Sequence, residues 1–265
     1  MDMTQIINLS FLPWLAPIPP SDLVRLGGKH DGGYIVSREA VLTSKSLLSL
    51  GIAYDIDFES AFISLNPNLE GLHLYDHTTR PFSAQYILSR ILRSIEFFSP
   101  KPFIGYIKFL QKRRRLLKKK SKFFRVKISD NNLNNNSTLT GALNLISQNS
   151  GRVFLKIDIE GDEYLILSEL ILHVDFISGL IIEFHDVSLH LDAVKNLVDS
   201  LKNEGLLMDH FHINNYGGFT INSLPNVIEL SFSRSKRDGN HRVKLPLVGL
   251  DAPNSPLRGD FEVTF

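Results

Sequence analysis

The chain has 265 residues, of which 43% are hydrophobic, and this is enough apolar material for the core of one large domain rather than a disordered protein. Its 29 basic and 28 acidic residues give a net charge of +1, which excludes a general electrostatic attraction to nucleic acid or anionic lipid. Because the chain has no cysteine, disulfides, thiolate metal sites and thiol nucleophiles are excluded, and metal ligands would be oxygen or imidazole groups. A cytoplasmic protein fits this composition.

The N-terminal part of the chain contains an apolar stretch, 11–20, that is rich in proline. It is too short and too proline-rich for a membrane span, and no basic region precedes it as in a signal peptide. We therefore expect 1–45 to wrap the domain as a lid or edge segment. Gly32 and Gly33 lie in this segment, and we interpret them as allowing a tight turn near a cofactor, with a simple surface turn as the alternative.

Seven apolar segments have the composition of β-strands, and helix-like segments separate the first five. The predicted strands are 46–50, 71–75, 123–128, 153–158, 180–184, 206–213 and 227–232. Alternating strands and helices predict an α/β fold, with a parallel sheet and helices on both faces. The connection 214–226 has no helical periodicity, and a parallel crossover normally needs a helix, so we expect the last strand to run antiparallel to its neighbour.

A basic segment, 83–122, lies between two predicted strands and is interpreted as two helices inserted into a single domain that spans 1–265. It contains the run KRRRLLKKK at 112–120, and such a run is most often a solvated helix face. A contact of 112–122 with anionic lipid or a glycolipid is the second interpretation. Nucleic acid is disfavoured as a partner because aromatic residues are not interleaved with the basic ones.

A glycine and several acids follow the first predicted strand. Gly51 lets the main chain approach a ligand, while Asp55, Asp57 and Glu59 suit a cationic or hydroxyl-rich ligand better than a pyrophosphate. One glycine is a weak signal, and a plain tight turn explains it equally well.

Acids also follow the next two predicted strands. Asp76, which precedes His77, has the position of the acid that hydrogen-bonds ribose hydroxyls in nucleotide sites, although it could be a helix N-cap. Asp130, which follows Ser129, could accept a hydrogen bond from an adenine amine or could be a turn residue. Acids at three successive strand ends indicate a nucleotide site more strongly than any one of them does.

Polar pairs close the fourth and fifth predicted strands: Asp158 with Glu160, and Glu183 with His185. Alternation along a strand puts the members of each pair on one side, so we expect these four groups to meet at neighbouring strand ends. Histidine has the pKa best suited to proton transfer near neutrality, although a lone histidine is often structural.

The segment LKIDIEGDEY at 155–164 is similar to the most recognisable signature of FkbM-type methyltransferases, a class I family that depends on S-adenosylmethionine. The resemblance runs nearly end to end. Its other segments are RLGGKHDGGYIV at 25–36, SLGIAYDIDFE at 49–59, LIIEFHD at 180–186, HINNYGG at 212–218, LPNVIELSF at 224–232 and DAPNSP at 251–256.

The resemblance implies a Rossmann-like fold, S-adenosylmethionine as donor, and an acceptor oxygen on a sugar, glycan or related small molecule. Gly51 would then lie under the methionine part, and Asp158 and Glu160 would border the transferred methyl group. Where the family often has a second glycine, this chain has Ala53 followed by Tyr54, which predicts a narrower site. The predicted cofactor-binding residues are Gly32, Gly33, Gly51, Ala53, Tyr54, Asp57, Glu59, Asp76, His77, Ser129, Asp130 and Asp158.

A polar turn near the end of the chain is the predicted acceptor site. His212, Asn214, Asn215 and Tyr216 offer hydrogen-bonding groups suited to a polyhydroxylated molecule, with an asparagine-rich turn as the alternative.

Two mechanisms are open for removing the acceptor's proton. His185 could accept it, oriented by Asp158 or Glu183. Alternatively, Mg²⁺ between Asp158, Glu183 and Asp186 could lower the pKa of the acceptor hydroxyl. A non-catalytic glycan- or lipid-binding domain of the same fold is the alternative function, suggested by Tyr54 and the basic insertion.

Overall fold

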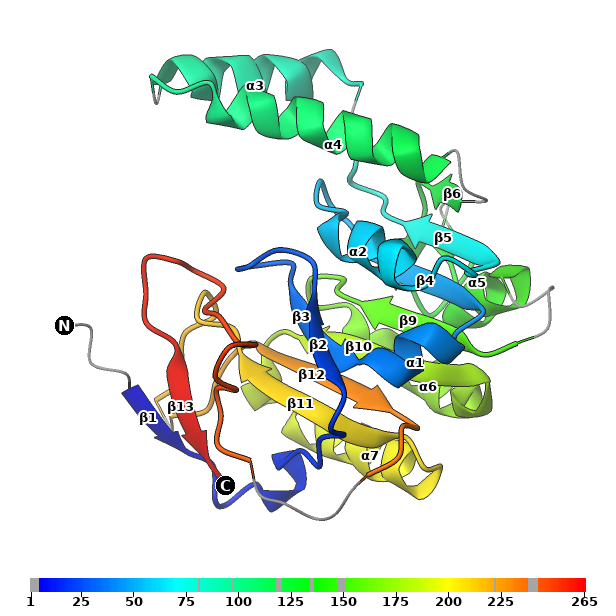
Figure 1. Ribbon diagram of the computed structural model, residues 1–265, viewed down its shortest axis with the longest axis vertical. Helices are drawn as coiled ribbons and strands as arrows, with labels where there is room; N and C mark the ends of the chain where they lie inside the picture. Colours follow the sequence, from blue (N-terminus) through cyan, green and yellow to red (C-terminus); the bar gives the residue numbers. More distant parts are fainter. Residues whose placement is uncertain are drawn as a thin grey trace.

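The computed structural model describes residues 5–80, 82–96, 98–117, 121–133, 136–146, 151–221, 223–237 and 243–265. Its centre is a seven-stranded sheet in the order β11-β12-β10-β9-β4-β5-β6, with helices on both faces (Figure 1). These strands are β4 (Ser46–Leu50), β5 (Gly71–Tyr75), β6 (Ser121–Phe124), β9 (Val153–Ile157), β10 (Ile177–Phe184), β11 (Leu207–Ile213) and β12 (Ile228–Ser233).

The direction of the strands confirms the predicted fold. Strands β10, β9, β4, β5 and β6 run parallel, whereas β12 runs antiparallel to both β10 and β11. Together with the strand order, the reversed β12 gives the sheet of a Rossmann-like class I methyltransferase fold.

The predicted strand 123–128 is present with other bounds, because β6 begins at Ser121 and the chain leaves the sheet after Phe124. Lys127–Ile128 instead form the short strand β7, which pairs with β8 (Asn136–Ser137) outside the main sheet. After this break, residues 126–128 lie next to the ends of β4, β5 and β9.

Side chains of alternating strand positions build two cores, one on each face of the sheet. Leu48, Leu155 and Ile182 belong to the core formed with α5 (Leu139–Ile146), α6 (Leu167–Leu172) and α7 (Leu191–Asn203). The opposite core includes Leu47 and Phe154 and is covered by α1 (Arg38–Thr43), α2 (Asp57–Leu65) and the hairpin β2 (Leu23–Leu26) and β3 (Tyr34–Ser37). Short 3-10 helices are η1 (Pro13–Leu15), η3 (Glu163–Ile166), η4 (Val174–Phe176) and η5 (Val187–Leu189).

The first and the last described strands lie together at the β11 side of the sheet (Figure 1). β1 (Gln5–Asn8) pairs in parallel with β13 (Phe261–Thr264), and the Ile18 amide donates to the Met208 carbonyl oxygen of β11 at 2.9 Å. The proline-rich stretch 11–20 therefore runs along this edge, and β3 packs across β10 and β12.

The basic insertion forms two helices, α3 (Ala84–Glu96) and α4 (Lys101–Leu117), which contact each other and project from the β5–β6 side of the sheet (Figure 1). We call residues 82–117 the arm. The last three lysines of the basic run, 118–120, lie outside the described residues. Among the described residues, no helix is long and apolar enough to cross a membrane.

Candidate functional site

The main-chain segments at the ends of β4, β5 and β9 are in close contact with one another. Gly51 has a φ of 77°, and a Cβ atom there would lie 1.5 Å from the Asp158 carbonyl oxygen. Its amide donates to the Tyr75 carbonyl oxygen at 2.9 Å, and the Asp158 amide donates to the Leu50 carbonyl oxygen at 3.1 Å. Only glycine fits this position, so the sequence brings three strand ends to one point.

A small pocket of about 140 Å³, partly open to solvent, lies at these strand ends. The predicted site residues that line it are Gly51, Ala53, Asp76, His77, Asp158 and Glu160. They come from three separate predicted motifs, so the sheet assembles one cavity from acids that are far apart in the sequence.

Asp76 is held in the pocket wall by its own loop. Its Oδ2 accepts from the Ala53 amide at 2.7 Å, while Oδ1 accepts from the Thr78 amide and hydroxyl, both at 2.7 Å, and from the Thr79 amide at 2.8 Å. Burial raises the pKa of Asp76, but these hydrogen bonds outweigh burial and leave the pKa lowered. Each carboxylate oxygen offers two lone pairs, so Oδ2 keeps one for a ligand hydroxyl.

Two predicted cofactor residues face the arm instead of the pocket. The ring of Tyr54 stacks on Tyr86 of α3 with 3.8 Å between centroids, and its hydroxyl accepts from the Arg80 amide at 2.9 Å. Asp57 forms an ion pair with Lys112 of α4. Tyr54 therefore does not narrow the pocket, and its real role is to hold the arm.

A third predicted cofactor residue, Glu59, is buried in the protein interior. Its Oε1 accepts from the Ser49 hydroxyl at 2.6 Å. Burial raises its pKa, and the nearby charge of Lys156 only partly offsets this. α2 begins at Asp57, so helical geometry turns Glu59 under the sheet and away from the strand ends.

The remaining predicted cofactor residues do not line the pocket. Gly32, with a φ of 75°, is in the turn between β2 and β3, where a Cβ atom would lie 2.8 Å from Asp55 Oδ2; Gly33 follows it. Ser129 and Asp130 follow directly after the lining residue Ile128, and their side chains hydrogen-bond each other at 3.2 Å.

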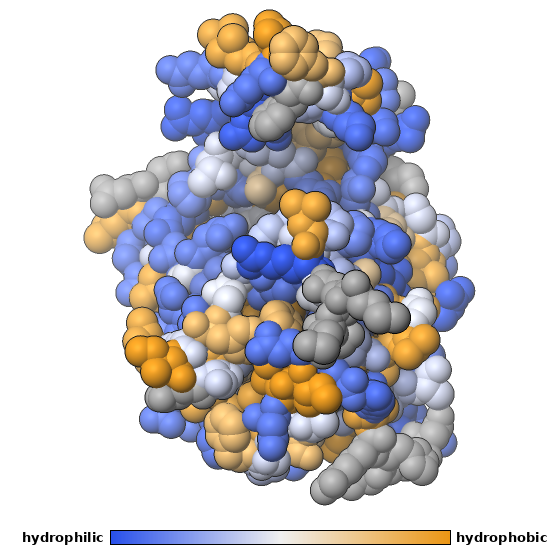
Figure 2. All heavy atoms as spheres, turned by 90° about the vertical axis from the view of Figure 1, so that its left-hand side faces the viewer, coloured by the Kyte–Doolittle hydropathy of each residue, from blue (hydrophilic) through white to orange (hydrophobic). Residues whose placement is uncertain are grey.

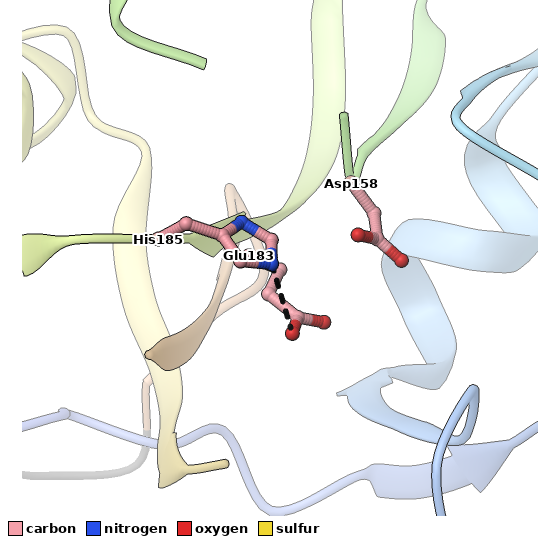
Figure 3. A group of neighbouring side chains, drawn as sticks. All are labelled: Asp158, Glu183 and His185. Atoms are coloured by element: carbon pink, nitrogen blue, oxygen red, sulfur yellow. Dashed lines mark ion pairs between the residues drawn. The ribbon is translucent and has the colours of Figure 1, made fainter. Parts of the chain in front are cut away.

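Next to the pocket, three side chains converge from the ends of adjacent strands β9 and β10 (Figure 3). One potential ligand atom each from Asp158, Glu183 and His185 lies within 4.8 Å of the other two. Asp186, predicted as a metal ligand, is not in this group, because its φ of 50° turns the chain into η5. His185 takes its place.

Tyr34, which sequence reasoning missed, bridges the two carboxylates. Its hydroxyl lies 3.0 Å from Asp158 Oδ2 and 3.3 Å from Glu183 Oε2, and Asn214 donates to Glu183 Oε1 at 2.9 Å. Burial raises the pKa of Glu183 well above its usual value, and the charges of Asp158 and Glu229 raise it further. Glu183 thus holds a proton much more tightly than an exposed glutamate.

A buried lysine supplies the positive charge beneath this cluster. Lys156 lies two residues before Asp158 on β9, so both face the same side, and its Nζ is 3.5 Å from Asp158 Oδ2. Burial lowers the pKa of Lys156, but the charges of Asp158, Glu59 and Glu183 outweigh this and raise it. The ammonium group therefore stays charged and balances the acids.

His185 is oriented by Glu163, not by Asp158 or Glu183 as predicted. Its Nδ1 lies 3.1 Å from Glu163 Oε1, and the fully buried Glu163 also accepts from the amides of Ile159 and Gly161, both at 3.1 Å. The Tyr164 hydroxyl donates to the His185 carbonyl oxygen at 2.6 Å. Because an ionised Glu163 can only accept, Nδ1 carries a proton and Nε2 is the ring atom that can take another.

The free Nε2 of His185 faces the other acids. It lies 3.6 Å from Glu160 Oε2 and 3.8 Å from Glu183 Oε1. Burial lowers the pKa of His185, but the hydrogen bond with Glu163 and the surrounding negative charges outweigh burial and raise it above its usual value. A turn, rather than strand alternation, brings Glu160 here, since β9 ends at Ile157 and Glu160 has a φ of 58°.

The predicted acceptor residues are mostly buried, because the C-terminal segment covers this edge of the sheet. His212 lies between Glu229, at 3.4 Å, and Asp260, at 3.1 Å, and Asn215 donates to the Gly259 carbonyl oxygen at 3.2 Å. Asn214 is also buried and reaches Glu183, so Tyr216 is the exposed member of the predicted set.

No protein-family model and no curated protein sequence matches the chain, so membership of the FkbM family stays a prediction. Among solved structures, it resembles an rRNA methylase from Streptococcus thermophilus, with 11% identity, a TM-score of 0.41, and coverage of 75% of this chain and 92% of that one. It also resembles precorrin-6y C5,15-methyltransferase from Geobacter metallireducens GS-15, with 11% identity, a TM-score of 0.37, and coverage of 75% and 87%.

A third structure, the aminoglycoside resistance methyltransferase NpmB1, has 12% identity and a TM-score of 0.29, with coverage of 80% of this chain and 98% of that one. Likenesses this low do not indicate an activity. The fold is established by the strand order of the chain itself.

Proposed function

We propose that the chain is an S-adenosylmethionine-dependent methyltransferase that methylates a hydroxyl group of a sugar, glycan or related natural product. One observation supports this proposal most strongly. The sheet has the strand order of a class I methyltransferase, and its pocket at the ends of β4, β5 and β9 adjoins a histidine flanked by acids. Ligands of open α/β sheets bind at these strand ends.

The residues that line the pocket suit a nucleoside that carries a sulfonium group. Gly51 allows the main chain to approach the ligand closely, and Asp76 Oδ2 has a lone pair for a ribose hydroxyl. Asp158 and Glu160 border the pocket and would stabilise the positive sulfonium. When bound, S-adenosylmethionine supplies an electrophilic methyl group, and its sulfur keeps the electrons of the broken bond.

His185 is the proposed general base. Nε2 takes the proton of the acceptor hydroxyl as its oxygen bonds to the methyl carbon, and Glu163 stabilises the imidazolium that forms. Tyr34 and Asn214 hold Glu183 beside this ring, so the acceptor meets a preorganised polar wall. A hydroxyl acceptor follows from the need for this base, and a sugar or glycan follows from the resemblance to FkbM-type enzymes.

The test is a transfer assay with methyl-labelled S-adenosylmethionine and a panel of sugars, glycans and polyketides. The wild-type protein is expected to label a hydroxyl, and His185→Ala is expected to lose that activity. His173→Ala is the matched control, because His173 lies at the end of α6, away from the group of Asp158, Glu183 and His185. A His185→Ala variant with normal turnover would remove this residue from the mechanism.

A divalent cation at the same cluster is a second way to activate the acceptor. Asp158, Glu183 and His185 offer two oxygens and one nitrogen within 4.8 Å of one another, which is a donor set suited to Mg²⁺ or a transition metal. Turnover that falls after chelation and returns with Mg²⁺ would support the cation. Turnover that survives exhaustive chelation would leave His185 as the base.

A non-catalytic binding domain is the remaining alternative. It was suggested in part by Tyr54, and the position of Tyr54 in the structure weakens that argument. Tyr54 stacks on Tyr86 outside the pocket, so the departure at this position does not obstruct the pocket. A domain of this kind should bind a glycan without binding S-adenosylmethionine, so a titration with the donor distinguishes the two.

A further inference from the structure

The arm carries apolar side chains that the described part of the chain leaves uncovered. α3 has no buried residue, and Phe98, between the two helices, is 96% exposed. Figure 2 shows apolar residues gathered at the top of the molecule, on the arm, with hydrophilic residues beside them. The exposed large apolar residues of the arm are Phe82, Leu88, Ile91, Leu92, Ile95, Phe98, Phe103, Ile104, Ile107 and Leu117.

Four of these residues form a continuous surface at the end of the arm. Ile91 and Ile95 of α3, Phe103 of α4 and Phe98 between them line one open groove. Contiguous exposed apolar surface of this kind marks a contact with a protein or a membrane, whereas scattered apolar residues need no explanation.

The charge of the arm identifies the partner. The arm, residues 82–117, contains eight lysines and arginines and one acid, a formal charge of +7. Because the whole chain has a net charge of +1, the rest of the protein carries −6. Arg93, Lys101 and Lys108 are exposed on the arm, and the two lysines line the groove between the arm and Tyr54 of the body. Among the described residues, none of these three cations forms an ion pair. An apolar end on an arm with unpaired cations suits an anionic lipid surface.

The base of the arm is firmly attached to the domain. Phe109 and Leu116 of α4 join the core on the α2 side of the sheet, and Tyr86 stacks on Tyr54. Lys112 pairs with Asp57 at the start of α2. The body therefore presents the apolar end at a distance from the sheet (Figure 1).

We infer that the arm docks the protein on an anionic lipid bilayer. The end with Ile95 and Phe98 enters the boundary between headgroups and acyl chains, and Arg93 and Lys101 contact lipid phosphates. A second copy of the chain is the less favoured occupant, because a symmetric contact would bring two strongly basic arms together. A polyanion such as RNA would match the charge but would leave the apolar groove exposed to water.

Vesicle flotation tests this inference with the intact protein. Vesicles of phosphatidylcholine alone are compared with vesicles containing about 30% phosphatidylserine, at roughly 0.1 M and 1 M salt. The protein is expected to float with the anionic vesicles at low salt and to bind more weakly at high salt. Neutral vesicles should retain little of it.

Two sets of variants separate the apolar and electrostatic contributions. Phe98→Asp together with Ile95→Asp should reduce binding on the order of tenfold or more. Arg93→Glu and Lys101→Glu should each reduce binding to anionic vesicles about fivefold. Leu189→Asp is the matched control, because Leu189 is an apolar residue on the body that is 77% exposed. Circular dichroism checks that each variant is folded.

Several results would overturn the inference. One is absence of binding to anionic vesicles, and another is equal binding by the Phe98 and Leu189 variants. A dimer detected by ultracentrifugation that needs Phe98, without vesicle binding, would identify a second copy as the occupant. Retention on heparin without vesicle binding would make the arm a polyanion site. None of these assays includes S-adenosylmethionine, so failure here leaves the proposed activity unaffected.

Discussion

The strand ends and the arm both carry many charged side chains, but the surroundings of these side chains differ. At the strand ends, Asp76, Glu183 and His185 each have protein partners that fix their positions. On the arm, Arg93 and Lys101 are exposed and form no ion pair within the described residues. The difference indicates a preorganised site for a small ligand and a surface for an extended partner. Substitutions in the two regions should therefore affect separate measurements.

The largest expected effect is on turnover. His185→Ala should reduce kcat by about 10²- to 10⁴-fold, because the proton acceptor is lost, without preventing donor binding. Glu163→Gln should reduce it less, since the ring is retained and only its orientation and charge stabilisation are weakened. Labelled-methyl turnover measures both. Equal turnover in the wild type and His185→Ala would break the assignment of chemistry to the strand ends.

The pH dependence of turnover sharpens the same assignment. The pKa of His185 is raised, and the base must be neutral, so turnover should fall as the pH is lowered through a pKa above about 6.5. In Glu163→Gln the hydrogen bond and charge that raise the pKa are weakened, so this fall should move to lower pH. A profile that stays unchanged would show that Glu163 does not act through His185.

Two glycines give the next largest difference. In Gly51→Ala, the new Cβ would meet the Asp158 carbonyl oxygen at 1.5 Å, so the three strand ends must separate, at a cost of several kcal/mol. In Gly105→Ala, within α4, the Cβ meets nothing within 4 Å, and the protein should gain about 1 kcal/mol of stability. Urea unfolding measures both. A tolerated Gly51→Ala would contradict the close packing at the site.

Stability at high pH should depend on the buried His212 of β11 and not on the arm. Burial lowers the pKa of His212, but its bonds to Asp260 and Glu229 outweigh this and raise it to about 10. Since the folded pKa is raised, this contribution is complete below about pH 6.5 and is lost as the pH rises through about 10, at a cost of a few kcal/mol. The unfolding midpoint, measured across this range, should fall less in His212→Gln than in wild type. An identical fall in both would assign the loss to other groups.

The smallest effect concerns the contact between the two regions. Tyr86→Ala removes the ring that stacks on Tyr54 and should cost about 1 kcal/mol of stability. Because Tyr54 lies outside the pocket, the affinity for S-adenosylmethionine should stay the same. Thermal unfolding and donor titration measure these two quantities. A large loss of affinity would mean that the arm shapes the donor site.

The sequence predicted the strand ends well because each is an apolar run followed by an acid or glycine, and this pattern is local. Asp158, Glu183 and His185 could be placed together for that reason. The partners of these residues could not be predicted, since Tyr34 is 124 positions from Asp158 and Asn214 is 31 positions from Glu183. Such contacts depend on how the hairpin and the reversed strand cross the sheet.

Other differences between prediction and structure arise because turns bring side chains together and because segments distant in the sequence bury predicted site residues. Glu163 orients His185 only because the turn through Gly161 folds it back under the strand end, and strand periodicity carries no sign of this. His212 and Asn215 have the composition of a binding turn, but the C-terminal segment buries them. The helices of the arm were predictable from sequence, whereas the stack between Tyr54 and Tyr86 was not.

Calorimetric titration with S-adenosylmethionine tests the central claim most directly. The wild-type protein should bind one molecule per chain, and Asp76→Ala should bind at least about tenfold more weakly, because the acid that fixes the loop and is proposed to bind the ribose is lost. The Leu189→Asp control should bind like the wild type. No heat of binding with the wild-type protein, or equal affinity in Asp76→Ala, would contradict a donor site at the ends of β4, β5 and β9.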